Sequence, residues 1–112
     1  MVRLWIRGPG METEAEVLVD TGFNGFLALP SKLTAKLGLR RRSVGRAVLA
    51  DGSERSFDIY EALILWRGCM VSVPVADASA EPLLGTNLLY GNELVIQMIE
   101  GGSVLISELP RS

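Results

Sequence analysis

Asp20 is the residue whose type and setting point most clearly to chemistry. It follows an apolar run at residues 17–19 and begins the turn DTGFNG, after which a second apolar run continues at residues 26–29. A carboxylate at the end of a buried strand costs free energy unless a hydrogen bond or a charge compensates it. Gly22 and Gly25 allow the loop to fold back and direct N–H groups at Asp20. The spacing alone fits equally well a hairpin with a solvated carboxylate at its tip.

The composition excludes several other kinds of site. The chain has no His, which excludes Ser-His and Cys-His nucleophile systems and His-based zinc sites. With one Cys there is no internal disulfide, and because Cys69 lies in an apolar run we expect a buried thiol rather than a nucleophile. The net charge is −2, and the basic cluster RRR at residues 40–42 fits a solvated loop better than a phosphate site. We therefore expect no nucleic-acid binding.

The N-terminal sequence MVRLWIRGPG lacks the apolar segment of a signal peptide. The longest uninterrupted apolar run, at residues 62–66, is too short to cross a bilayer. These observations predict a cytoplasmic protein that does not associate with a membrane.

The elements that must position Asp20 are predicted to be short strands separated by turn residues. The expected strands cover residues 2–7, 12–20, 26–29, 44–49, 57–66, 70–75, 93–99 and 103–107, with a loop at 77–82. Pro30 and the spacing of Leu33 and Leu37 predict a short helix at 31–37, and residues 83–90 start apolar and become a second short helix. The pattern predicts one all-β domain over residues 1–112, a closed barrel or sandwich with one or two short helices.

Two motifs occur in a fixed order: LVDTG at residues 18–22 and LLGTNLL at residues 83–89. Together they resemble the two signatures of the retropepsin-like aspartic proteases, the single-domain family that includes the retroviral proteases. The chain looks most like the small bacterial members, and the resemblance covers residues 2 to about 109. It implies that Asp20 is the catalytic carboxylate, that Thr21 hydrogen-bonds into a partner's loop and that Gly22 accepts the substrate backbone. It also implies a structural second motif formed by Leu84, Gly85 and Asn87.

An Asp-Gly pair between two predicted strands is a strong hairpin signal, and it falls where the family has its flap. By resemblance, the flap tip that closes over an extended peptide substrate consists of Ala50, Asp51, Gly52 and Ser53. An ordinary surface hairpin is the alternative.

Peptide hydrolysis without a metal, a His or a reactive Cys requires an acid and a base around one water. Two carboxyl groups about 3 Å apart can fill both roles, because they share one proton. The chain has a single Asp-Thr-Gly, so the pair requires two chains related by a two-fold axis. The other carboxylates considered, Asp51, Asp58 and Asp77, lie in no comparable glycine loop.

The chain departs from the family pattern at two places. Viral members pair an acidic residue with an Arg at the positions held here by Asn24 and Thr86. Both residues are neutral in this chain, so neither position carries an unpaired charge. Phe23 stands where a small residue is usual, and its ring either narrows the primary substrate pocket or packs into the core.

The expected protein is a homodimeric aspartic endopeptidase that acts on polypeptides and uses no metal or cofactor. We expect residues 2–6 and 104–109 to interleave with those of the partner; the alternative is that they pair within one subunit. A rival function is a non-catalytic dimer that binds an extended peptide or a partner protein. A third interpretation is a small barrel in which Asp20 is only a turn residue.

Overall fold

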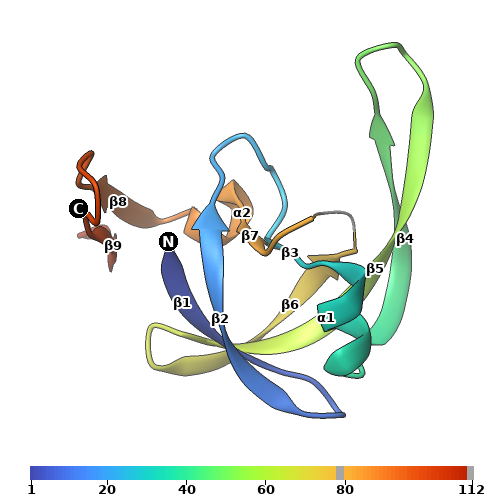
Figure 1. Cartoon of the computed structure of the whole chain (residues 1–112), viewed down its shortest axis with the longest axis horizontal. Helices are drawn as coiled ribbons and strands as arrows, with labels where there is room; N and C mark the ends of the chain where they lie inside the picture. The colour runs from blue at the N-terminus through green and yellow to red at the C-terminus, as the bar shows by residue number, and fades with distance from the viewer. Residues whose placement is uncertain (78–79, 111–112) are drawn as a thin grey trace.

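The computed structural model describes residues 1–77 and 80–110 (Figure 1). Its strands are β1 (Val2–Arg7), β2 (Glu12–Val19), β3 (Leu27–Ala28), β4 (Arg40–Val48), β5 (Glu54–Trp66), β6 (Cys69–Ala76), β7 (Leu83–Leu84), β8 (Asn92–Ile96) and β9 (Val104–Glu108). The helices are α1 (Ser31–Lys36) and α2 (Thr86–Leu89). The expected loop at residues 77–82 includes residues 78–79, which lie outside the described part.

The described strands form a closed barrel, which confirms the predicted all-β class. Six of them follow each other in the order β1-β2-β7-β3-β6-β5, and β5 closes the ring by pairing with β1 at Ile6↔Ile64. Strand β4 pairs only with β5, and Figure 1 shows this hairpin extending well beyond the barrel. Closure pairs the edges of the short strands with one another.

The core lies inside the ring, where alternate residues of each strand point inward. Ile6, Val17, Leu27, Ile64 and Val75 are fully buried. Burial of a side chain of this size contributes about 1.5–3 kcal/mol, so these residues supply much of the folding free energy.

Strand β4 begins earlier than the sequence predicts, at Arg40 instead of residue 44. The three consecutive arginines therefore lie in a strand, and the expectation of a solvated loop is wrong. They pair with β5 at Arg40↔Glu61 and Arg41↔Tyr60, and the register then shifts by one residue before Ser43. This β-bulge interrupts the usual alternation, which explains why the segment gives no strand signal in the sequence.

Cys69 is exposed, so the prediction of a buried thiol is wrong. It has the same phase in β6 as the buried Val73 and Val75, but it pairs with Trp66 at the tight β5–β6 turn, beyond the edge of the core.

The phase of β5 also differs from its apolar pattern. Phe57, Ile59, Leu63 and Leu65 stand at odd positions, yet Leu63 and Leu65 are exposed, whereas Ala62 and Ile64 at even positions are buried. The face of a strand that points into the core is decided by its register with the neighbouring strands. Because both faces of β5 are apolar, its sequence does not identify the buried face.

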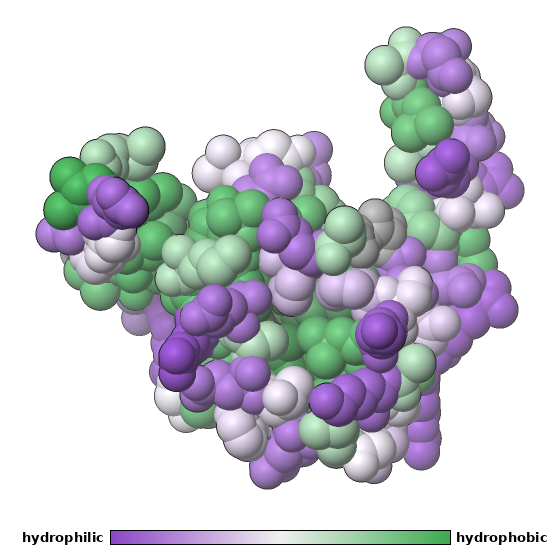
Figure 2. Space-filling view, viewed as in Figure 1, coloured by the Kyte–Doolittle hydropathy of each residue, from purple (hydrophilic) through white to green (hydrophobic). Residues whose placement is uncertain are grey.

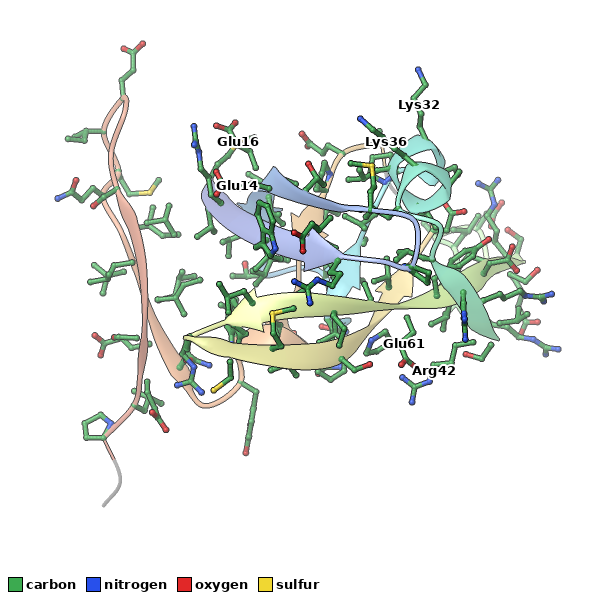
Figure 3. All side chains as sticks on the ribbon, turned by 90° about the horizontal axis from the view of Figure 1, so that it is seen from below. Glu14, Glu16, Lys32, Lys36, Arg42 and Glu61 are labelled. Carbon is green, nitrogen blue, oxygen red and sulfur yellow. The ribbon has the colours of Figure 1, made fainter. Side chains whose placement is uncertain are left out.

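The two terminal segments pair within the chain. β1 pairs with β2 along its whole length, and on its other edge it pairs with β5 only at Ile6 and Arg7. β8 and β9 pair with each other in a separate two-stranded sheet, which stands apart from the barrel in Figure 3. Leu94 and Ile106 pack this sheet against the core, and Arg67 at the β5–β6 turn forms an ion pair with Glu108 at 3.3 Å.

In the described residues, no helix has the length and apolar character needed to span a membrane.

Candidate active site

Asp20 lies directly after β2, where the chain leaves the barrel and turns. Its backbone N–H donates to the carbonyl of Leu84 at 2.9 Å, and its own carbonyl accepts from Phe23 N–H at 3.1 Å. The half-buried carboxylate accepts a hydrogen bond from the backbone N–H of Gly22 at 2.9 Å. The glycine loop thus folds back on the carboxylate as the sequence predicts. The interaction fixes the position of one carboxylate oxygen.

Gly22 is exposed, and the space above it is restricted by the carboxylate itself. A Cβ at this position would lie 3.2 Å from Asp20 Oδ1. Thr21 is exposed beside it, at the outer surface of the loop. A residue that turns outward next to the carboxylate is available to a second molecule.

The second motif lies beside the Asp20 loop, as expected. β7 is placed between β2 and β3, parallel to β2 at Val19↔Leu84 and antiparallel to β3 at Leu27↔Leu84. Leu84 is fully buried. The strands that enter and leave the Asp20 loop are therefore both fixed to the same two-residue strand.

Gly85 continues from β7 into a space too small for any side chain. A Cβ there would lie 2.2 Å from the carbonyl oxygen of Gly25 and 2.7 Å from the Phe23 ring. Its backbone angles, φ −101° and ψ 174°, are ordinary extended values. Glycine is needed here because of close packing and not because of an unusual backbone conformation.

Short backbone hydrogen bonds join the start of α2 to the Asp20 loop. Thr86 N–H donates to the Phe23 carbonyl at 2.9 Å, and Asn87 N–H donates to the Gly25 carbonyl at 3.1 Å. The Thr86 hydroxyl also donates to the Phe23 carbonyl at 3.3 Å. These contacts between the loop and α2 are all neutral, and Asn24 lies exposed.

Phe23 is half-buried and lies over two glycines. Its ring would contact a Cβ added at Gly25 or at Gly85, at 2.4 and 2.7 Å. The same residue lines a pocket between the loop and the β4–β5 hairpin. Phe23 therefore packs against the loop and also forms part of the pocket wall.

The predicted flap tip is the turn between β4 and β5. Leu49 N–H donates to the Ser53 carbonyl at 2.7 Å, and Gly52 adopts φ 85°, a conformation that favours glycine. The Asp51 carboxylate accepts from both the hydroxyl and the backbone N–H of Ser53, at 2.5 and 2.9 Å. The hydroxyl bond, followed by the backbone bond, holds the pKa of Asp51 below its usual value. Ala50 to Ser53 are exposed, and the tip stands away from the barrel (Figure 1).

A pocket of about 650 Å³ separates this hairpin from the Asp20 loop. Figure 2 shows the surface hollowed on the inner side of the projecting hairpin. Its lining comes from Phe23 in the loop, from the hairpin, and from the ends of β3, β6 and β7: Phe23, Ala28, Ala47, Leu49, Arg55, Ser56, Phe57, Asp58, Ala76, Asp77 and Leu83. The volume lies in the range of small-molecule and peptide side-chain pockets.

Several of these lining residues were not predicted from the sequence. Ala47 in β4 and Leu49 just after it are alternate residues, as are Arg55 and Phe57 in β5. This alternation is visible in the sequence and places the residues of each strand on one face. Which face covers the pocket depends on how the hairpin bends over the barrel. Asp20 is not one of the lining residues, although Phe23 of the same loop is.

Among the described residues, no group of three or more His, Cys, Asp and Glu side chains is placed to hold a metal ion. Comparisons of the chain with protein families, with curated proteins and with solved structures find no match.

Proposed function

We propose that the protein is a homodimeric aspartic endopeptidase of the retropepsin-like type, in which each chain supplies one catalytic Asp20. The observation that carries the proposal is the position of Asp20. Its carboxylate is half-buried in a loop that is hydrogen-bonded to β7 and α2, and it accepts a hydrogen bond from Gly22 N–H. A turn residue with no function would not need a loop fixed from both sides.

One chain supplies only half of the required chemistry. Two carboxyl groups about 3 Å apart cannot both ionise, so one stays protonated while the other is charged. The charged group takes a proton from water, and the protonated group polarises the scissile carbonyl. The exposed position of Thr21 beside Asp20 supports a partner loop at this surface.

The C-terminal hairpin offers a surface for the second subunit. Large hydrophobic side chains are exposed on it and on its flanks: Tyr90, Val95, Ile96, Met98, Ile99, Leu105 and Leu109. Figure 2 shows this hydrophobic surface on the C-terminal hairpin formed by β8 and β9. Apolar surface that gathers on one element is typical of an interface between proteins. We place the dimer contact on this hydrophobic surface.

The pocket under the hairpin supports an extended peptide as the substrate. An extended peptide would lie between the hairpin and the Asp20 loop, and the pocket would take one of its side chains. Closure of the tip would exclude water from the reaction. The Phe23 ring restricts the pocket, so we expect small residues to be preferred next to the scissile bond.

The test is cleavage of a mixed peptide library by the pure dimer, from acid to neutral pH. Asp20→Asn should abolish cleavage and leave the dimer intact. Glu16→Gln is the matched control, because it removes an exposed carboxylate from β2, the strand that leads to Asp20, and it should cleave like the native protein.

If the native dimer binds peptides but cleaves none under any condition, the peptide-binding function replaces this proposal. If the protein is a monomer at every accessible concentration, Asp20 has no second carboxylate and is only a turn residue.

A further inference from the structure

Four arginines line a second pocket, at the end of the barrel opposite Asp20. The pocket has a volume of about 560 Å³ and is lined by Arg7, Gly8, Pro9, Arg40, Arg41, Arg42, Glu61, Ala62 and Leu63. It lies at the turn between β1 and β2, whereas Asp20 follows the other end of β2 (Figure 1). Since β2 has 8 residues, at about 3.4 Å each the two sites are separated by roughly 25 Å.

Three consecutive residues of β4 border this pocket. Arg40, Arg41 and Arg42 line it together with residues 61–63 of the neighbouring strand β5, and the register between the two strands shifts by one residue between Arg41 and Ser43. Bulges of this kind redirect side chains and are frequent beside functional sites.

The charges of the pocket are only partly compensated. Arg7 pairs with Glu12 at 2.7 Å and Arg41 with Asp58 at 3.1 Å. Arg42 pairs loosely with Glu61 at 3.8 Å, and these two side chains lie together at the rim in Figure 3.

In residues 1–77 and 80–110, the recorded ion pairs do not include Arg40, which is exposed. The paired arginine and carboxylate side chains at the pocket are 43–59% exposed, and such surface pairs contribute only about 0–1 kcal/mol. A stronger anion can therefore recruit their guanidinium groups at little cost.

We propose that this pocket binds a compact polyphosphate, a small ligand with two or three linked phosphate groups. A guanidinium presents its N–H donors in a planar fork that matches phosphate oxygens in pairs. Several linked phosphates provide enough acceptors for forks that arrive from two strands. The volume suits a ligand of this size, and Pro9, Ala62 and Leu63 give the pocket apolar walls.

The test is calorimetric titration of the full-length protein with inorganic tripolyphosphate at one fixed ionic strength. We expect saturable binding at one site per chain. Arg40→Gln should weaken the binding at least tenfold, because it removes the arginine with no recorded ion pair and leaves the other ion pairs intact. Arg40→Lys keeps the charge but loses the fork, and it should give an intermediate affinity.

Arg46→Gln is the matched control, since Arg46 is an exposed arginine of the same strand that does not line the pocket. It should bind within twofold of the native protein. Equal weakening by Arg40→Gln and Arg46→Gln would show a diffuse charge effect and overturn the proposal, as would the absence of saturable binding at millimolar tripolyphosphate. Binding to vesicles that contain a phosphoinositide, without binding to free tripolyphosphate, would overturn it as well.

Discussion

Replacement of Gly85 by Ala tests the packing that holds the Asp20 loop. The new Cβ would lie 2.2 Å from the Gly25 carbonyl oxygen and 2.8 Å from the Phe23 carbonyl oxygen. Both obstacles are backbone atoms, so no side-chain rotation relieves the collision. Overpacking in a core typically costs about 1–3 kcal/mol, and we expect the upper end of this range here.

The expected loss is large compared with the free energy of unfolding of a small domain, which is about 5–15 kcal/mol. A loss of about 3 kcal/mol lowers the melting temperature of a chain of this size by roughly 10–15 °C. The assay is urea unfolding at one fixed protein concentration, because dimer formation would add a concentration-dependent contribution.

Gly52→Ala is a useful contrast, because it replaces a glycine with open space around it. Nothing lies within 4 Å of its Cβ, but its φ of 85° is unfavourable for Ala, so we expect a loss of about 1 kcal/mol from the backbone alone. A loss below 1 kcal/mol for Gly85→Ala would refute the close contact between β7 and the Asp20 loop.

Three further predictions address the loop, the flap tip and the dimer surface. Thr86→Val removes the hydroxyl that donates to the Asp20 loop, and chemical denaturation should show a loss of about 0.5–1 kcal/mol; no loss would mean that this hydrogen bond is absent in solution. Ser53→Ala should raise the pKa of Asp51 toward its usual value in an NMR titration, since the Ser53 hydroxyl is the main cause of the lowered pKa. The native tip is therefore most stable above the ordinary Asp pKa of about 3.9 and loses this contribution as the pH falls through the lowered value; an unchanged midpoint in the variant would contradict this. Ile99→Asp should raise the dimer dissociation constant at least tenfold in sedimentation equilibrium, whereas Val44→Asp, at an exposed apolar residue of β4, should not; equal effects would place the dimer contact elsewhere.

The sequence predicts the fold class well because its local signals are strong. Glycine and proline mark the ends of most strands, and the Asp-Gly pair correctly predicts the β4–β5 turn. The two motifs, LVDTG and LLGTNLL, also predict the contact between the Asp20 loop and Gly85. In the structure, a Cβ at Gly85 would meet the Gly25 carbonyl oxygen and the Phe23 ring.

The features that were missed depend on contacts between distant residues. The bulge at Arg41 changes which face each side chain takes, and no local pattern signals it. The exposure of Cys69 follows from where the core ends, and the core boundary depends on the length of the neighbouring strands. The pairing of Ile6 and Arg7 with β5 likewise depends on the closure of the barrel.

The most direct measurement is the distance between the two Asp20 carboxyl groups in a crystal structure of the assembled dimer. We expect a two-fold axis between them, with carboxyl oxygens about 3 Å apart and able to share one proton. Asp20 side chains that lie on separate faces of every assembly, each surrounded by solvent, would contradict it.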